Sequence, residues 1–227
     1  MFIYGEESMY PINLNMTGRA CAVVGGGRVA QRKIERLLDY GAKVTVISPE
    51  LGPELQSLAE TGQIIWQQTA YSKARDLLEG FFCVFCATDD GEINRQAALE
   101  AKAKGALVNV ATAPELGDFT LPGVVKRGPV QFTVDTDGTS PGFSRLLRED
   151  VAQRYHDGFG EFAVFLQEIR QELMAKYGDS QQRGKLWRRL LTADIIELIL
   201  DNDLDGAKNE IRRGISSFGT EPSDSPR

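Results

Sequence analysis

The chain has 227 residues, a formal net charge of −6, 42% hydrophobic residues and 26% charged residues. This length allows one large domain or two to three small ones, and the composition is sufficient for a buried core. The negative charge and the lack of any basic block longer than two residues argue against a nucleic-acid surface. No apolar run approaches the roughly 20 residues of a membrane helix, and residues 1–11 lack the basic region of a signal peptide. We therefore expect a cytoplasmic protein with no membrane partner.

Residues 19–50 form the most informative segment. A short apolar run at 20–24 is typical of a buried strand, and the sequence GGGRVA at 25–30 follows it directly. A helical apolar period comes next, then Gly41 as a helix stop, and then a second strand at 43–47. This context turns a weak G-x-G-x-x-G/A match into a prediction of a dinucleotide-binding βαβ unit. The alternative is a glycine-rich turn that serves packing alone.

The predicted unit gives its residues separate roles. Gly25 permits the tight turn, Gly27 lets a pyrophosphate approach the backbone, and the helix beginning near Arg28 offers its N–H groups to the phosphates. Glu50 is the only carboxylate placed after the second strand to bond the ribose hydroxyls. No Arg or Lys lies in that turn to hold a 2′-phosphate, so the sequence favours NAD over NADP.

Three further strands, at 64–68, 82–87 and 107–110, alternate with helices expected at 51–59, 76–78 and 93–101. This alternation predicts a parallel, doubly wound sheet, that is, an α/β domain of the Rossmann type. Ligands bind such sheets at the carboxyl ends of the strands. We therefore expect the glycine loop, residues 48–50, Thr88-Asp89 and residues 109–112 to line one crevice.

The strand at 82–87 contains a C-x-x-C pair, Cys83 and Cys86. Residues three apart on a strand point to opposite faces, so the two thiols are poorly placed to share one metal ion. We interpret them as small core residues and predict no metal site.

The pattern changes after Pro114. Strands at 119–127 and 130–135 flank a Gly128-Pro129 turn, and Ser140-Pro141 is typical of a helix start. This segment is too small for a core of its own. We predict a Rossmann domain at 1–113, a small α+β dimerisation segment at 114–150 and an all-helical C-terminal domain at 151–227, with 216–227 disordered.

Several segments together resemble one family, the precorrin-2 dehydrogenases, which form the dehydrogenase and ferrochelatase module of sirohaem synthases. The segments that carry the resemblance are VVGGGRVAQRK, GAKVTVISPEL, ATDDGEIN, NVATAPELGDFTLP, RGPVQFTVDTDGTSPGFSRLLRE and LWRRLL. They extend from about residue 10 to about residue 215. The chain resembles the stand-alone form, without the methyltransferase domain of the fused enzymes.

The resemblance implies NAD-dependent oxidation of precorrin-2 to sirohydrochlorin by a homodimer whose central segment interlocks with its partner. Some members of the family also insert Fe²⁺ to make sirohaem. Combining the crevice with the positions carried over from the family, we predict the cofactor-binding residues Gly25, Gly26, Gly27, Arg28, Val29, Ser48, Pro49, Glu50 and Thr88.

One departure from the family pattern concerns iron insertion. Members often carry an aspartate after N-V-x that is held to be important for both activities, and here Thr112 stands at that position. A threonine cannot act as a carboxylate base at neutral pH. Chelation requires the removal of two pyrrole protons, so we expect dehydrogenase activity with weak or absent Fe²⁺ chelatase activity.

Three residues are candidate catalytic groups: Asp89, Asp118 and Thr112. Asp89 follows the fourth strand and either acts on the substrate or caps the next helix with Asp90. Asp118 lies on the crossover after the fifth strand, where the alternative is an exposed turn acid. The single histidine, His156, lies outside the matched motifs, and we interpret it as a surface residue.

Precorrin-2 is a polyanion, so its site requires cations and helix N-termini. The helix start at Thr139-Ser140-Pro141, with Arg145 and Arg148 beyond it, offers both, and Lys126 and Arg127 could add to them. The alternative is an ordinary capped helix with a solvated basic face. The predicted substrate-binding residues are Asn109, Thr139, Ser140, Arg145 and Arg148.

Two other functions share the dinucleotide-binding unit. One is an NAD-dependent dehydrogenase that acts on another polyanionic substrate, and the other is a non-catalytic NAD-sensing module. The first gives no reason for the TSP helix start, and the second needs neither the central segment nor its cations.

Overall fold

The computed structural model describes residues 9–72 and 76–218 of the chain. Its contacts divide the chain into two compact units, Met1–Leu121 and Pro122–Arg227, and each unit is described by itself. Among the described residues, no helix combines the length and the apolar character needed to cross a membrane.

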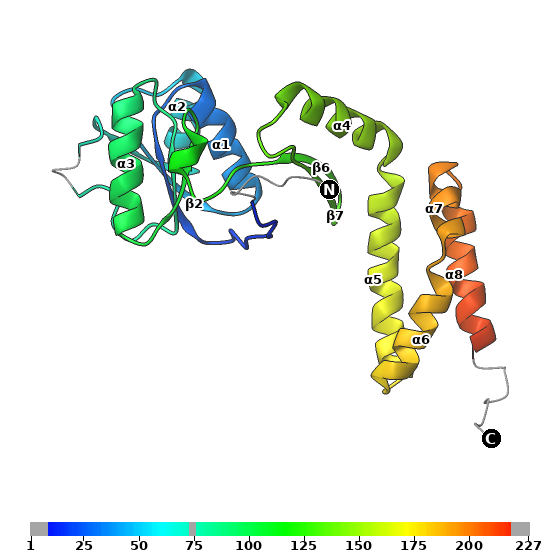
Figure 1. Ribbon diagram of the computed structural model, residues 1–227. Helices are drawn as coiled ribbons and strands as arrows, with labels where there is room; N and C mark the ends of the chain where they lie inside the picture. The colour runs from blue at the N-terminus through cyan, green and yellow to red at the C-terminus, as the bar shows by residue number, and fades with distance from the viewer. Residues whose placement is uncertain (1–8, 73–75, 219–227) are drawn as a thin grey trace. The chain divides into compact units, whose positions relative to one another are not determined.

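The first unit contains a five-stranded sheet in the order β3-β2-β1-β4-β5, and every neighbouring pair is parallel. The strands are β1 (Ala20–Val24), β2 (Lys43–Ser48), β3 (Ile64–Gln68), β4 (Cys83–Cys86) and β5 (Leu107–Val110). The helices are α1 (Arg28–Asp39), α2 (Pro53–Glu60) and α3 (Gly91–Ala103) (Figure 1). The predicted doubly wound sheet is confirmed. The strand order reverses between β1 and β4, which is where such sheets bind their ligands.

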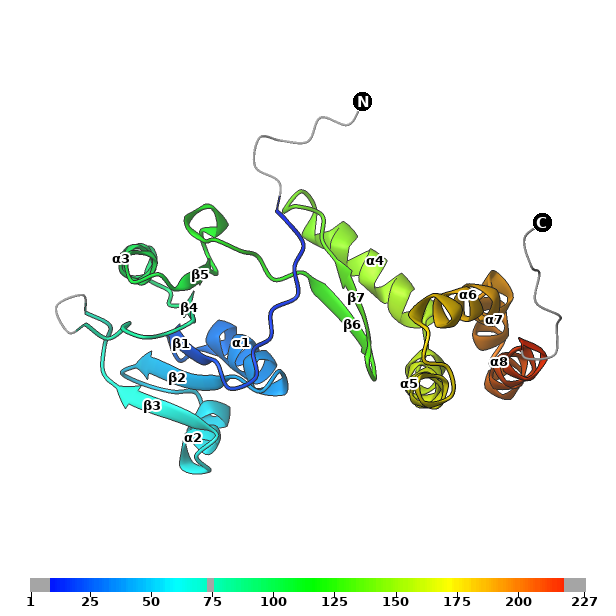
Figure 2. The ribbon, with the colours of Figure 1, turned by 90° about the horizontal axis from the view of Figure 1, so that it is seen from below.

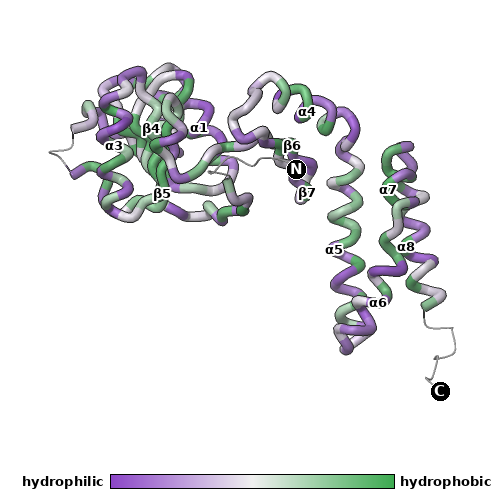
Figure 3. The backbone as a smooth tube through the Cα atoms, viewed as in Figure 1, coloured by the Kyte–Doolittle hydropathy of each residue, from purple (hydrophilic) through white to green (hydrophobic). Residues whose placement is uncertain are grey.

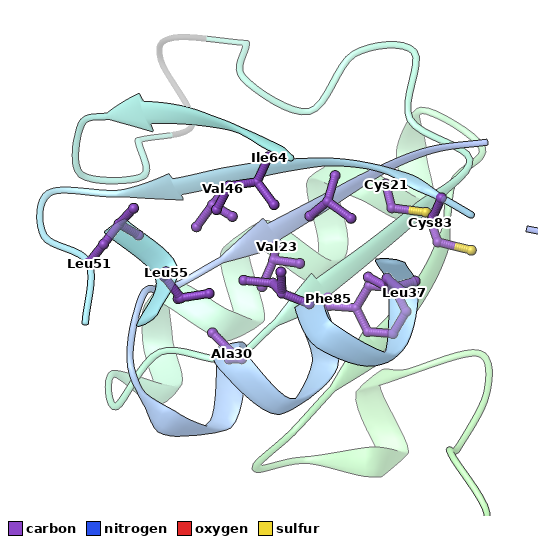
Figure 4. Close-up of a cluster of buried hydrophobic side chains, with 14 residues drawn as sticks. Cys21, Val23, Ala30, Leu37, Val46, Leu51, Leu55, Ile64, Cys83 and Phe85 are labelled. Carbon is purple, nitrogen blue, oxygen red and sulfur yellow. The ribbon is translucent and has the colours of Figure 1, made fainter. Parts of the chain in front are cut away.

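Helices cover both faces of this sheet (Figure 2). On one face, side chains such as Val23, Val46 and Phe85 pack against α1 and α2, as Figure 4 shows. On the other face, Val24 and Val84 pack among the alanines of α3. Because both faces are covered, the central strands are continuous apolar runs rather than alternating ones, and they form hydrophobic stretches in Figure 3.

The second unit begins with a two-stranded antiparallel hairpin, β6 (Gly123–Arg127) and β7 (Val130–Val134). The helix α4 (Pro141–Arg154) follows, and the Ser140 Oγ accepts a hydrogen bond from the Phe143 N–H at 3.3 Å. The predicted helix start at Ser140-Pro141 is therefore confirmed. Burial alternates along β7, as the sequence pattern indicated, but none of its residues is fully buried.

Four helices complete the second unit: α5 (Gly158–Lys176), α6 (Ser180–Leu190), α7 (Ala193–Leu200) and α8 (Leu204–Phe218). A third apolar cluster holds them together, with Phe165, Leu186 and Ile211 among its buried members. The period of apolar residues in this part of the sequence is thus the period of a helical core.

The structure differs from the sequence-based expectations in three places. Residues 77–80 form a turn, so the short helix expected at 76–78 is wrong. Residues 216–218 belong to α8 rather than to a disordered tail, and residues 219–227 lie outside the described part. The crossover 114–121, with the short 3₁₀ helix η2 (Pro114–Leu116), belongs to the first unit, which ends at Leu121 and not at residue 113. The further division at residue 150 stays a prediction.

Candidate functional site

Two glycines of the loop between β1 and α1 are required by packing. Gly25 has a φ of +118°, and a Cβ at this position would lie 2.5 Å from the Ala87 carbonyl oxygen. A Cβ at Gly26 would collide with the Glu50 carbonyl oxygen, and the Gly52 N–H donates to the Gly26 carbonyl at 3.1 Å. These two positions bring the ends of β1, β2 and β4 together, because a side chain at either position would hold them apart.

Gly27 differs from both of its neighbours. It has ordinary extended geometry as the N-cap of α1, and a Cβ there would meet no atom within 4 Å. Among the residues that the structure describes, no side chain caps α1, and the first turn of the helix contains no acidic residue. The first N–H groups of the helix have no intrahelical acceptor and carry the positive end of the helix dipole. The open space beside Gly27 is suited to a dinucleotide phosphate, and a side chain at Gly27 would occupy it.

In the turn after β2, Ser48 stabilises the turn itself, whereas Glu50 is exposed to a ligand. Ser48 is buried, and its hydroxyl donates to the Glu50 carbonyl at 2.6 Å. The Trp66 indole N–H donates to the Ser48 carbonyl at 2.9 Å. These bonds fix the turn, whereas the residues Pro49 and Glu50 are exposed. Glu50 is thus exposed where it could bond ribose hydroxyls. The Ser48 hydroxyl supports the turn, and the cofactor contact that we expected for Ser48 stays a prediction.

Asn94 connects the loops that follow β4 and β5. It lies on α3 with no exposed surface. Its Oδ1 accepts from the Thr88 N–H at 3.0 Å and from the Thr88 hydroxyl at 2.8 Å. Its Nδ2 donates to the Thr88 carbonyl at 2.9 Å and to the Thr112 Oγ1 at 3.3 Å. Two predicted site residues, Thr88 and Thr112, are therefore held by one side chain that the sequence analysis did not single out.

Asp89 and Asp90 have different environments. The Asp90 carboxylate accepts from the Glu92 and Ile93 N–H groups at 2.8 and 3.1 Å and is the N-cap of α3. Asp89 is exposed beside it and does not share the capping. Asp90 therefore caps α3, which was the alternative role that the sequence left open for Asp89. Asp89 remains available to a ligand.

Asp118 is bound to the edge of the sheet. Its N–H donates to the Val108 carbonyl at 2.8 Å, and its carboxylate accepts from the Val108 N–H at 2.9 Å. The same carboxylate forms an ion pair with Lys102 at 3.0 Å. These contacts extend β5 into the crossover and give Asp118 a structural role, and its catalytic role stays a prediction.

Asn109 is also engaged. It is only 6% exposed, its Nδ2 donates to the Phe119 carbonyl at 2.9 Å, and its Oδ1 accepts from Lys33 Nζ at 2.7 Å. The Lys33 ammonium also lies 5.8 Å from the centre of the Phe85 ring. Each end of the Asn109 amide therefore has a partner, and this residue joins α1 to the crossover. Its contact with a substrate stays a prediction.

Lys33 itself was not a candidate in the sequence analysis, because it lies among ordinary charged residues of an amphipathic helix. Burial lowers the pKa of its ammonium, and the neighbouring charges of Arg32 and Arg36 lower it further. What distinguishes Lys33 is its contact with Asn109, which lies 76 positions away in the chain. Local sequence patterns cannot predict a contact over that separation.

In the second unit, the predicted substrate residues lie at the start of α4. The Thr139 hydroxyl donates to the Thr136 carbonyl at 2.6 Å, and the Ser140 hydroxyl is the helix cap. Arg145 forms an exposed ion pair with Glu149 at 2.8 Å, and the aliphatic part of Arg148 packs near Gly123. Arg148 has no ion pair among the described residues, so it is the most available of the predicted cations.

Arg127 and His156 make intramolecular contacts. The Arg127 guanidinium donates to the Ala152 and Tyr155 carbonyls at 2.8 and 2.9 Å, which caps the carboxyl end of α4. The His156 Nε2 lies 2.8 Å from the Ile199 carbonyl oxygen, and the residue is half-buried rather than on the open surface. Both side chains are thus engaged in contacts within the chain.

The three cysteines are buried and unpaired by disulfides. Cys83 faces the same apolar cluster as Cys21, whereas Cys86 lies in the cluster on the opposite face of the sheet. Burial raises the pKa of Cys86 to about 12. Among the described residues, no group of three or more His, Cys, Asp or Glu side chains could hold a metal ion.

Comparisons with known families match two parts of the chain. Residues 12–123 match a family of NAD(P)-binding domains. Residues 158–215 match the sirohaem synthase dimerisation region. This second match lies beyond residues 114–150, for which we predicted the dimerisation role.

The chain is also similar to individual proteins. It is 37% identical to the siroheme synthase of Methylobacillus flagellatus over 92% of the chain and 44% of that protein. It is 34% identical to the siroheme synthase of Chromobacterium violaceum over 93% of the chain and 45% of that protein. The chain thus spans less than half the length of these relatives.

A solved structure, titled SirC, precorrin-2 dehydrogenase, resembles the whole fold. It is 26% identical and superposes with a TM-score of 0.69, covering 94% of this chain and 100% of that one. Both units therefore have counterparts within one known structure.

Proposed function

Because this chain belongs to the sirohaem synthase family, we propose that it is an NAD-dependent precorrin-2 dehydrogenase that forms sirohydrochlorin. The observation that supports this most is the likeness to a precorrin-2 dehydrogenase that covers 94% of this chain and the whole of the other. The open first turn of α1 at Gly27 supports NAD as the cofactor.

The residues of the first unit have distinct parts in this reaction. When bound, NAD supplies the hydride acceptor. The N–H groups at Gly27, Arg28 and Val29 would hold the pyrophosphate, and Glu50 would bond the ribose hydroxyls. Asp89, exposed after β4, is the proposed base for the proton that leaves the substrate. Asp118 is occupied by the edge of β5, which is why Asp89 is preferred.

The substrate is a polyanion, and the second unit offers cations for it. Arg148, two turns into α4, is the leading candidate, because Arg145 already pairs with Glu149 and Arg127 caps the carboxyl end of the helix. With Thr112 in place of an acid, Fe²⁺ insertion is expected to be weak or absent.

The proposal includes a homodimer and a location in the cytoplasm. Residues 158–215 match a dimerisation region, and α4 exposes Phe143 and Leu146 to 53% and 61%. Exposed apolar side chains of this size favour a second copy of the chain as a partner. The three buried free thiols fit a reducing compartment. Light scattering after size exclusion that gives a monomer at micromolar concentration would contradict the dimer.

The test of the reaction is anaerobic incubation of the protein with precorrin-2 and NAD. We expect sirohydrochlorin and NADH to appear together in the absorbance spectrum. Gly27→Val is the matched inactive control, since it leaves the fold intact and blocks the cofactor. No turnover by folded protein that binds NAD would overturn the proposal in favour of another polyanionic substrate or an NAD-sensing role.

A further inference from the structure

The orientation of the Asn94 amide is fixed by the backbone of one residue. The Thr88 N–H can only donate, so the atom it contacts at 3.0 Å is an oxygen. The Thr88 carbonyl can only accept, so the atom it contacts at 2.9 Å is the nitrogen. The positions of the oxygen and the nitrogen in an asparagine amide are often ambiguous. Here the two backbone groups of Thr88 decide which atom is which.

This orientation decides the polarity of the Thr112 hydroxyl. The second proton of Asn94 Nδ2 points to Thr112 Oγ1 at 3.3 Å, so the hydroxyl oxygen is an acceptor in this contact. The hydroxyl's own proton must then be donated elsewhere. Within the part of the chain that the structure describes, Thr112 donates to no acceptor, and the residue is exposed. Thr112 therefore presents a hydrogen-bond donor at the carboxyl end of β5.

Resting on the proposed function, we propose that Asn94 is a positioning residue that holds the Thr112 hydroxyl as a donor to a carboxylate of the bound tetrapyrrole. An aspartate at position 112 would present an acceptor and a negative charge instead. A carboxylate-rich substrate is repelled by a charge but accepts a bond from a hydroxyl. Threonine in place of aspartate at position 112 therefore has two effects. It removes a base, and it strengthens the binding of the polyanion.

The four hydrogen bonds of the Asn94 amide divide into a structural set and a single bond to Thr112. Asn94 makes three of its four bonds to Thr88, and those bonds hold the loop after β4 regardless of Thr112. The single bond to Thr112 crosses from α3 to the loop after β5. Removing the Thr112 hydroxyl leaves the three other bonds in place and removes the proposed donor together with the acceptor of one Asn94 Nδ2 proton.

The experiment measures the dissociation constant of sirohydrochlorin, by its absorbance change on titration, for the full chain and its variants. Thr112→Val should raise this constant about tenfold, as expected for one hydrogen bond to a charged group. Thr112→Ser, which keeps the hydroxyl, should stay within about twofold of wild type. The NAD dissociation constant should not change in either variant. Thr112→Ser should keep the wild-type melting temperature, whereas Thr112→Val should lower it slightly because Asn94 Nδ2 loses an acceptor.

A double-mutant cycle tests the role of Asn94. Asn94→Ala should weaken sirohydrochlorin binding in the wild-type background and have no further effect in the Thr112→Val background. A loss that is equally large in both backgrounds would make Asn94 structural only and overturn its positioning role. If Asn94→Ala does not fold, the pair Thr112→Val and Thr112→Ser still decides the donor.

The outcomes separate this inference from the proposed reaction. Unchanged sirohydrochlorin binding in Thr112→Val overturns the donor role, whatever the turnover. The expected binding pattern without turnover of precorrin-2 supports the donor role and overturns only the dehydrogenase. Wild-type protein that does not bind sirohydrochlorin overturns both.

Discussion

The five-stranded sheet and the hairpin with α4 differ in what covers them. All four residues of β4 are buried, and helices pack on both faces of its sheet. In β6, β7 and α4, Val125 is the only buried residue, although their sequences are also rich in valine and leucine. The sheet completes its core within its own unit, whereas α4 leaves the apolar side chains of Phe143 and Leu146 exposed.

This comparison predicts which property each substitution will alter. Except at Gly25 and Gly26, where packing excludes a side chain, changes at the carboxyl edge of the sheet should affect ligands and leave the fold intact. Changes on α4 should affect association and leave the cofactor site intact. The following tests address these expectations in order of expected effect.

The largest effect is expected for Thr112→Asp. If chelation lacks only a base at position 112, this variant should raise the rate of Fe²⁺ insertion into sirohydrochlorin by about 10²–10⁴-fold. The rate is measured anaerobically from the absorbance of the metallated product. Thr112→Asn is the matched control, since it has the same shape without a base, and it should remain at the wild-type level. Wild-type protein that already inserts Fe²⁺ well above the spontaneous rate would show that another group removes the protons.

The second test concerns the glycine loop. Gly27→Val should weaken NAD binding by at least about a hundredfold, roughly 2.7 kcal/mol, because the side chain occupies the space of the pyrophosphate. Its melting temperature should stay close to wild type. Gly25→Ala is the contrasting variant, since its positive φ and the nearby Ala87 carbonyl predict a loss of stability. Binding that survives within tenfold in Gly27→Val would remove the cofactor from this loop.

The third test moves to α4. Leu146→Glu places a charge on the exposed apolar face and should raise the dimer dissociation constant at least about tenfold. Sedimentation or light scattering over a concentration series measures this constant. Leu99→Glu is the matched control on α3, where the leucine is 52% exposed but belongs to the self-contained sheet unit. Equal effects of the two substitutions would contradict the contrast between the units.

The smallest effect is expected for Lys33 and depends on pH. The pKa of its ammonium is lowered in the folded protein, chiefly by burial, so the unfolded chain binds more protons between that lowered pKa and the usual value of about 10.4. Stability contributed by Lys33 therefore rises with pH through this window. The urea midpoint of wild type minus that of Lys33→Met should therefore increase as the pH is raised from 7 towards 10.

Lys43→Met provides the control for this last test, because Lys43 is exposed at the start of β2. The difference between wild type and Lys43→Met should not vary with pH in the same direction. A pH-independent difference for Lys33→Met would mean that Lys33 is as well solvated as Lys43.

Local patterns in the sequence determined much of this molecule. The apolar runs at 20–24, 43–47 and 107–110 predicted strands because a strand buried on both faces tolerates few polar residues. The caps at Asp90 and Ser140 follow from the chemistry of helix ends, which here involves only residues two or three apart. The GGG loop was recognisable because the turn between β1 and α1 requires glycine.

Tertiary structure alone decided which predicted site residues remain available. Asp118 and Asn109 looked like ligands in the sequence, but their polar atoms pair with Val108, Phe119 and Lys33. Asn94 had no distinguishing mark until the order β1-β4-β5 placed its amide between two strand ends. Periodicity and capping are properties of neighbours along the chain, whereas the partner of a buried polar group depends on how distant strands are ordered in the sheet.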